Sequence, residues 1–186
     1  MITIIFESHG ATFDNENHLS SGWFDAELSP LGKKQAKELG ERYKNEKFDA
    51  IFCSDLQRSY KTAKTAEIAF ERRDFEIIKD KRLRECDYGD FTKHSSEKVE
   101  AEKGKRIIEP FPNGETYEQT AERMKSFLED LLKNYDGKKV MIIGHRATQY
   151  GLEHWINGAP LKEIVIKPWK WQAGWEYELE SIKLKY

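Results

Sequence analysis

Two histidines that each follow a short apolar run are the residues of this sequence best suited to chemistry. His9 comes after the run at residues 2–6, and His145 comes after the run at residues 140–143, with a glycine beside each histidine. Short apolar runs bounded by glycine are typical of buried strands. A single histidine at a strand end is more often structural, but the carboxyl ends of parallel strands lie beside the ligand crevice of an α/β sheet. If these two strands are neighbours, the imidazoles converge there.

The chemistry that suits such a pair is phosphoryl transfer. A neutral imidazole attacks phosphorus, and cationic side chains hold the phosphoryl oxygens. Metal binding by His9 and His145 is an alternative, but the sequence has no HExxH motif and no cluster of metal ligands at the usual spacing. The residue types therefore favour phosphoryl chemistry without a metal or another cofactor.

The elements that must position these residues alternate between apolar runs and helical patterns. This alternation predicts an α/β fold, a three-layer α/β/α sandwich with a mainly parallel central sheet. Expected strands cover residues 2–6, 48–53, 75–78 and 140–143, with possible closing strands at 164–166 and 176–182; expected helices cover 30–45, the segment after an N-cap at Ser54-Asp55, 96–107, 117–135 and a segment ending near 158–160.

Apolar stripes at helical spacing support two of these helices. Between residues 30 and 45, Leu31, Leu39 and Tyr43 form a stripe that we expect to be buried. The clearest stripe in the chain recurs every three or four residues from Tyr117 to Tyr135. A seam for a partner helix is possible there, but packing against the core of the same domain is the commoner use.

Size and composition favour a single domain over residues 1–186, with an insertion at about 80–113 that forms a wall of the site. The net charge is −2 and no basic block stands out, so nucleic-acid binding is not expected. The N-terminal apolar run is too short for a secretion signal, and no run reaches membrane-spanning length. Cys53 and Cys86 lack metal-ligand spacing, which favours reduced thiols in the cytoplasm.

Several short motifs in a fixed order resemble those of the histidine phosphatase superfamily, the group that includes cofactor-dependent phosphoglycerate mutases. That family opens with Arg-His-Gly-Glu/Gln-Thr/Ser. The matching segments here are Ser8-His9-Gly10-Ala11-Thr12 followed by Asn15, Gly22-Trp23 with Asp25, LSPLGKKQA at 28–36, CSDLQRSYKTA at 53–63, RLREC at 82–86, NGET at 113–116, and Gly144-His145. The resemblance implies a phosphoglycerate mutase-like fold.

The resemblance also implies a role for each matching residue. His9 would take the phosphoryl group as a phosphohistidine, and His145 would stabilise charge on the transferring oxygens. Arg58 would bind the same phosphate in fork geometry. Glu85 would protonate the leaving oxygen and then activate water, although it could instead only pair with Arg82 or Arg84. Asn15 would lie beside the phosphate.

Two departures from the family pattern affect the phosphate pocket. Ser8 stands where the family has arginine, and Ala11 stands where an acidic residue is expected. Ser8 is kept among the phosphate-binding residues, but it brings no guanidinium. Arg146 directly follows the second histidine, where the family commonly has glycine, and we hypothesise that it restores the missing positive charge. The alternative is an arginine turned to solvent at a helix start.

The leading expectation is a phosphatase that hydrolyses small phosphate monoesters of metabolites through a phosphohistidine on His9. A mutase is less expected, because the resemblance implies that the family's mutases usually carry a longer segment here, which excludes water from the site. The alternative from another class is a weak or inactive relative that binds a phosphorylated ligand or a protein partner, which Ser8 and Ala11 keep open. Two groups of aromatic residues are candidates for the leaving-group side, namely Tyr88, Phe91 and Phe111 of the insertion and Trp155, Trp169, Trp171 and Trp175 of the C-terminal part. The alternative for the tryptophans is packing in the core or at an interface, which is their commoner use near a C-terminus.

Overall fold

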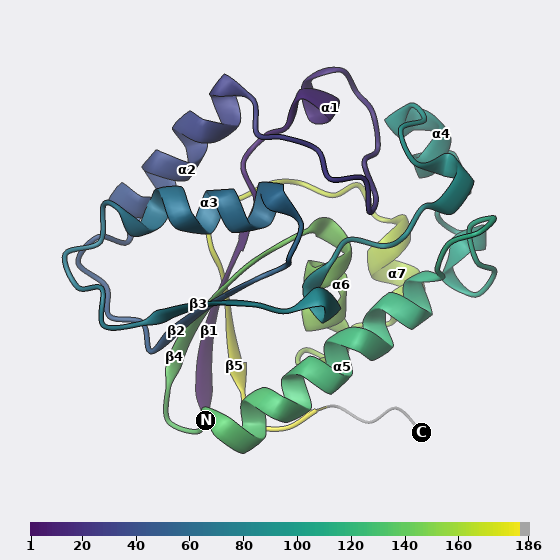
Figure 1. Ribbon diagram of the computed structural model, residues 1–186. Helices are drawn as coiled ribbons and strands as arrows, with labels where there is room; N and C mark the ends of the chain where they lie inside the picture. Colours follow the sequence, from purple (N-terminus) through teal and green to yellow (C-terminus); the bar gives the residue numbers. More distant parts are fainter. Residues whose placement is uncertain (183–186) are drawn as a thin grey trace.

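A five-stranded sheet forms the centre of the computed structural model, which describes residues 1–182. The strands run in the order β3-β2-β4-β1-β5, and β5 alone is antiparallel to its neighbour (Figure 1). The mainly parallel α/β sheet expected from the sequence is therefore confirmed. The strands are β1 (Ile2–Ser8), β2 (Ala50–Cys53), β3 (Glu76–Lys79), β4 (Lys139–Gly144) and β5 (Trp175–Leu179).

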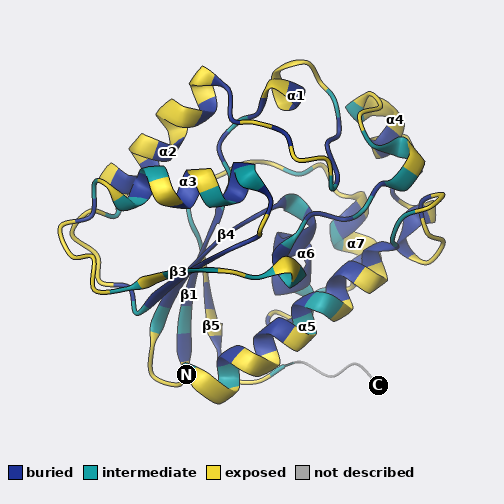
Figure 2. Cartoon of the chain, viewed as in Figure 1, coloured by how far each residue is buried: buried dark blue, intermediate teal, exposed yellow. Residues whose placement is uncertain are grey.

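Helices cover both faces of this sheet. On one face lie α2 (Pro30–Arg42) and α3 (Gln57–Glu67), and on the other lie α5 (Tyr117–Asn134) and α6 (Arg146–Trp155) (Figure 1). Alternate residues of β1 point to the two layers, because side chains alternate across a strand. Ile5 packs in the α2/α3 cluster, whereas Ile4 and Phe6 pack in the cluster under α5 and α6. Figure 2 shows the buried strands between helices whose outer sides are exposed.

The long stripe on α5 packs against its own domain. Met124, Leu128 and Leu131 are buried against the sheet, and Tyr117 and Ala121 are buried against the insertion and α6. The interpretation that this stripe packs in the core is confirmed, and the alternative that it forms a seam for a partner helix is wrong.

The expected stripe on α2 is wrong at Leu31, whose side chain is 47% exposed. This helix instead buries small residues at Gly32, Ala36 and Gly40 beside Leu39. A Cβ on Gly32 would lie 1.9 Å from the carbonyl oxygen of Ala11, so the backbone after His9 packs directly on the helix. This close approach, rather than a row of leucines, fixes α2 near the site.

Two predicted boundaries also differ from the structure. The run at 164–166 lies in α7 (Leu161–Ile166), because Leu161 and Val165 bury one side of a helix; a short apolar run does not distinguish a strand from a buried helix. The N-cap of α3 is Leu56 rather than Ser54 or Asp55, and it makes no side-chain cap bond. The side chains of Ser54 and Asp55 have other partners.

Two irregular segments cover the carboxyl ends of the strands. The loop after β1 contains a short helix, α1 (Phe13–Glu16), and the segment between β3 and α5 contains α4 (Ser96–Glu102) and three 3₁₀ turns at Lys81–Leu83, Gly89–Phe91 and Lys105–Ile107. The single helix expected at 96–107 is thus divided in two. Val99, Ile107 and Phe111 pack together with α6 and α7, which ties this segment to the body of the protein.

Candidate functional site

The ends of β1 and β4 bring the two histidines together, as the sequence predicted. The strands are hydrogen-bonded neighbours with Ser8 opposite Gly144, and the backbone N–H of His9 donates to the carbonyl of Gly144 at 3.1 Å. The ring centroids of His9 and His145 lie 5.0 Å apart. The convergence therefore follows directly from the register of two parallel strands.

His9 is held in a form suited to nucleophilic attack. Its Nδ1 lies 2.7 Å from the carbonyl oxygen of Gly10, which can only accept, so Nδ1 carries the proton and Nε2 keeps a free lone pair. Burial, followed by the charge of Arg58, lowers the pKa of His9 to about 3. The imidazole is therefore neutral across the physiological range.

His145 is the more enclosed of the two rings. Its Nε2 lies 2.7 Å from the hydroxyl of Ser54, while its Nδ1 is buried without a hydrogen-bond partner among residues 1–182. Burial, followed by Arg58 and His9, holds the pKa of His145 well below its usual range. A neutral ring with one unsatisfied nitrogen is costly to bury and is able to make one more hydrogen bond.

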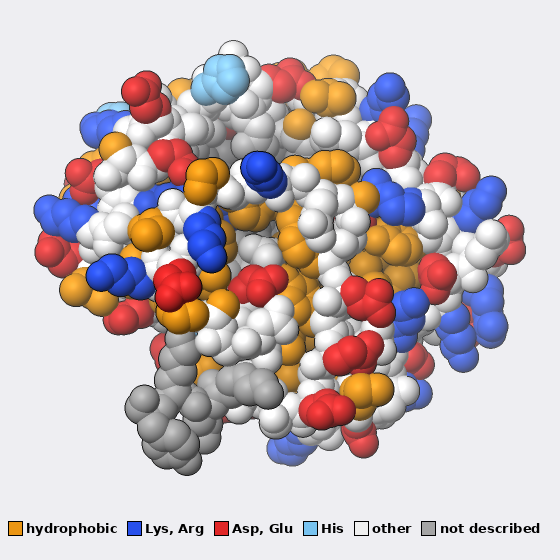
Figure 3. Space-filling view, turned by 180° about the vertical axis from the view of Figure 1, so that it is seen from behind, with side chains coloured by type: hydrophobic (Ala, Val, Ile, Leu, Met, Phe, Trp, Pro, Cys, Tyr) orange, Lys and Arg blue, Asp and Glu red, His pale blue; other side chains and the backbone are white. Residues whose placement is uncertain are grey.

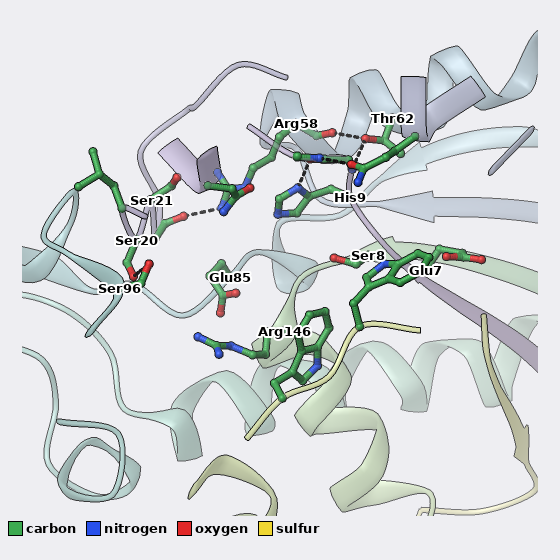
Figure 4. A pocket seen from close by; sticks show the side chains of 18 of the residues that line it. Glu7, Ser8, His9, Ser20, Ser21, Arg58, Thr62, Glu85, Ser96 and Arg146 are labelled. Atoms are coloured by element: carbon green, nitrogen blue, oxygen red, sulfur yellow. Dashed lines mark hydrogen bonds between the residues drawn. The ribbon is translucent and has the colours of Figure 1, made fainter. Parts of the chain in front are cut away.

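Arg58 supplies an unneutralised positive charge beside both rings. It lies in the first turn of α3, is 2% exposed, and donates to the carbonyls of Gly22 (2.7 Å) and Phe24 (2.9 Å). In the described part of the chain, no carboxylate pairs with it within ion-pair distance. A buried guanidinium held only by carbonyls favours an anion, and Figure 4 shows Arg58 and His9 on the same side of the cavity.

Glu85 faces this region and is bound by backbone donors. Its side chain accepts from the N–H of Cys86 at 2.8 Å and from the N–H of Ala147, in the first turn of α6, at 3.3 Å. The alternative that Glu85 only pairs with Arg82 or Arg84 is wrong. Those arginines pair with Asp80 and Asp130, and with Asp55, respectively.

Arg123 fixes the backbone that carries Glu85. Its guanidinium donates to the carbonyls of Arg82 (2.7 Å), Arg84 (3.2 Å) and Glu85 (3.2 Å), and it forms an ion pair with Glu115. The indole of Trp23 donates to the carbonyl of Glu85 at 2.7 Å. Arg123 and Trp23, from two distant parts of the sequence, thus hold the backbone that carries this carboxyl group.

A cavity of about 600 Å³ joins these groups to solvent and is much larger than a phosphate ion. His9, Arg58, Glu85, Ser8 and Arg146 all line it. His145 is not among the lining residues and is 1% exposed. Of the expected leaving-group aromatics, Tyr88, Trp169 and Trp171 line the cavity, whereas Phe91, Phe111, Trp155 and Trp175 pack elsewhere.

Three predicted phosphate-binding residues line the cavity, and two of them have other contacts as well. Asn15 lines the cavity, but its side-chain oxygen accepts from the N–H (3.0 Å) and hydroxyl (2.9 Å) of Thr12 and caps α1. Arg146 lines the cavity and pairs with Glu100 at 2.5 Å, so it is not turned to solvent. Ser8 lines the cavity with a short, uncharged side chain.

Sequence reasoning missed Ser54, Glu7 and Glu100. Ser54 follows β2 at the same sheet edge as the histidines, a position that could have indicated a partner for one of them. Glu7 is a charged residue within an apolar run; it is 1% exposed and accepts from Arg42 and Tyr43. Glu100 lies on an exposed helix of the insertion, and no local pattern indicates its contact with Arg146.

Comparison with known proteins identifies the family. The model of the histidine phosphatase superfamily (branch 1) matches residues 4–170. The chain belongs to this superfamily. The resemblance carried by the motifs around His9, Arg58 and His145 is therefore confirmed at the level of the family.

Several members of the superfamily match along most of this chain. Phosphoserine phosphatase 1 of Hydrogenobacter thermophilus is 33% identical over 88% of this chain and 80% of the relative. A phosphoglycerate mutase of Schizosaccharomyces pombe is 34% identical over 87% and 82%. Among solved structures, Bacillus stearothermophilus YhfR superposes with a TM-score of 0.84, at 22% identity, over 99% of this chain and 95% of that one, which shows the same fold.

Proposed function

We propose that this histidine phosphatase superfamily member hydrolyses small phosphate monoesters through a phosphohistidine formed on His9. The observation that carries the proposal is the neutral His9 ring 5.0 Å from His145, beside the unpaired charge of Arg58. A nucleophile that is free of a proton at Nε2 and a fixed cation for the phosphoryl oxygens are the parts that phosphoryl transfer needs.

The reaction follows from the position of each group. Nε2 of His9 bonds to phosphorus while the phosphorus–ester oxygen bond breaks, and Glu85 gives its proton to the leaving oxygen. Water then attacks the phosphohistidine, Glu85 takes the proton from that water, and inorganic phosphate leaves with His9 restored. Arg58 donates to the phosphoryl oxygens in both steps. We assign the unpartnered Nδ1 of His145 to the same oxygens; since this ring does not line the open cavity, the contact forms only when the phosphoryl group lies against His9.

Hydrolysis is favoured over phosphoryl exchange between two positions of one substrate. Relatives named phosphoserine phosphatase and phosphatase PhoE match most of the chain, alongside relatives named phosphoglycerate mutase. The segment between β3 and α5 is short, and the cavity it borders is open to water.

The rival proposal, a weak or inactive binding protein, rests on Ser8, because losing one charge-assisted contact to phosphate costs about 1.5–3 kcal/mol, or roughly one to two decades in rate.

The test compares the parent with His9→Ala and with His94→Ala as a control at an exposed histidine. We expect the parent and the control to hydrolyse an aryl phosphate and His9→Ala to lose at least about three decades of kcat/KM. Rapid acid quench and mass spectrometry should detect a phosphoryl group on the peptide that contains His9. Equal activity in all three proteins, or none in the parent, contradicts the proposal.

The setting of this activity is also proposed. We infer a single cytoplasmic domain over residues 1–186 that acts on free phosphorylated metabolites without a nucleic-acid partner. Within residues 1–182, no helix is long and apolar enough to cross a membrane, and Cys53 and Cys86 are unpaired and buried. On the face shown in Figure 3, acidic and basic side chains are interspersed, which supports the absence of a polyanion-binding surface there.

A further inference from the structure

The part of the cavity beyond Glu85 is where a leaving group must lie, if His9 is the nucleophile. In phosphoryl transfer the attacking and leaving atoms are roughly in line through phosphorus. Figure 4 shows Glu85 and Arg146 pointing into the open space across from His9, with Ser20 and Ser96 at the left of that space. With its ester oxygen at Glu85, the rest of the substrate's alcohol therefore extends towards Arg146.

Arg146 belongs to a group of three charged residues with a net positive charge. Its Nη2 lies 2.5 Å from Oε1 of Glu100, and Nζ of Lys103 lies 2.6 Å from Oε2 of the same carboxylate. Lys103 is only 4% exposed and also reaches the hydroxyl of Tyr150 at 3.3 Å. Two cations share one carboxylate, which leaves one excess positive charge in this group. A partly buried site with one excess positive charge favours an anion.

The guanidinium of Arg146 also has unused donors. Its Nη2 is bonded to Glu100, but its Nε and Nη1 have no hydrogen-bond partner in the described part of the chain, and the side chain is 24% exposed to the cavity. An arginine presents its donors as a fixed fork that fits the two oxygens of a carboxylate or phosphate. Ser20 and Ser96, whose hydroxyl oxygens lie 3.4 Å apart, add polar groups to the lining of the same cavity.

Arg146 acts on a different part of the site from Arg58. The charge of Arg58 contributes to the lowered pKa of both His9 and His145, and Arg146 is not among the causes of either shift. Partial burial opposes ionisation of Glu100, but Arg146 and Lys103 outweigh it and lower the pKa of that carboxyl. Figure 4 likewise shows Arg58 and Arg146 on opposite sides of the open space.

We propose that Arg146, held by Glu100 and Lys103, binds a second anionic group on the alcohol part of the substrate. The preferred substrates are then phosphate monoesters whose alcohol also carries a carboxylate or another phosphate. This inference rests on the proposed phosphatase activity, and it assigns Arg146 to the leaving group instead of to the transferred phosphate. Under this assignment, Arg146 does not replace the arginine that the family has at position 8.

Matched substrate pairs test the inference. Glycerol 3-phosphate and 3-phosphoglycerate differ by a carboxylate in place of a hydroxymethyl group, and phosphoethanolamine and phosphoserine differ by an added carboxylate. Fructose 6-phosphate and fructose 1,6-bisphosphate form a third pair for a second phosphate. We expect the parent to prefer the more anionic member of at least one pair by about tenfold or more in kcat/KM, because a charge-assisted hydrogen bond contributes that much.

The variants are Arg146→Gln and Arg146→Lys, with Glu97→Gln as a control at an exposed site on α4 outside the cavity. Arg146→Gln should reduce the preference ratio towards one, mainly through KM, Arg146→Lys should retain part of it, and the control should keep it. Which pair responds identifies carboxylate or phosphate as the second anion.

Two results overturn the inference. One is a parent that hydrolyses both members of every pair equally well. The other is an Arg146→Gln variant that loses activity equally on both members of each pair while its melting temperature is unchanged, which would place Arg146 on the transferred phosphate. If the parent hydrolyses no substrate at all, the proposed phosphatase function itself fails, which is a distinguishable outcome.

Discussion

The residues around His9 are held mainly by backbone atoms, whereas those around Arg146 are held by one another's side chains. His9 and Arg58 bond to the carbonyls of Gly10, Gly22 and Phe24. Arg146 instead depends on Glu100, a residue that is 39% exposed on a seven-residue helix of the insertion. We call the part of the cavity at His9 the first end and the part at Arg146 the second end. The first end is fixed by the strands and loops of the fold, and the second end is fixed by replaceable side chains.

This difference separates chemistry from selectivity. Backbone contacts survive most substitutions of neighbouring side chains, so the geometry at His9 persists as long as the fold does. Side-chain contacts change with a single substitution, which permits a new leaving-group preference without disturbing the phosphoryl-binding end. Substitutions at the first end should therefore affect every substrate equally, and substitutions at the second end should affect substrates selectively.

Arg58→Ala should show the largest effect on this comparison. Removing Arg58, whose charge acts on both imidazoles, should lower kcat/KM by about a thousandfold or more on every phosphate monoester, because transition-state charge loses a fixed donor in a buried site. Steady-state kinetics on the matched substrate pairs measures it. Arg72→Ala, at an exposed arginine, is the control. A selective effect of Arg58→Ala, confined to one member of each pair, would contradict the division between the two ends.

Ser54→Ala should have a smaller effect that is still shared by all substrates. The hydroxyl of Ser54 is the partner of Nε2 of His145, and donation from it leaves the proton on Nδ1, the nitrogen that is free for the phosphoryl group. Without it, either nitrogen can carry the proton, and kcat should fall about tenfold with KM little changed. Ser126→Ala, at an exposed serine on α5, is the matched control. A change in KM alone would indicate that Ser54 serves substrate binding instead.

The same division explains how far the sequence could predict the structure. Apolar runs ending in Gly-flanked histidines predicted the two strands and their convergence, because strand ends of a parallel sheet have few alternatives. The motif CSDLQRSYKTA placed Arg58 in the first turn of a helix, as observed. These residues lie on regular elements whose geometry follows from local patterns.

The residues that the sequence did not reveal depend on contacts between distant segments. Nothing around Glu100 indicates Arg146, which is far away in the chain and meets it only after the insertion folds over the sheet. The exposed Leu31 shows the same limit, because the backbone at Ala11 packs on Gly32 and the buried side of that helix does not include the leucine. Local periodicity reports a face of a helix, but it does not report which neighbour covers it.

The smallest predicted effect is on stability and also concerns the first end of the cavity. In the folded protein the pKa of His9 is about 3, whereas the unfolded chain takes up this proton near 6.5. Between these values the unfolded state binds more protons, so the free energy of unfolding should fall as pH decreases from about 6.5 to about 3. His145, whose pKa is also lowered by burial, contributes in the same direction.

Urea unfolding across this range should show a pH slope of the free energy of unfolding that is shallower in His9→Gln than in the parent, by up to about 1.4 kcal/mol per pH unit. The slope should be unchanged in His94→Gln, at an exposed site, because that ring is exposed to solvent when the protein is folded as well as when it is unfolded. An equal slope in all three proteins would mean that the ring of His9 accepts its proton while still folded, and the neutral nucleophile on which the first end depends would then be lost below its ordinary pKa.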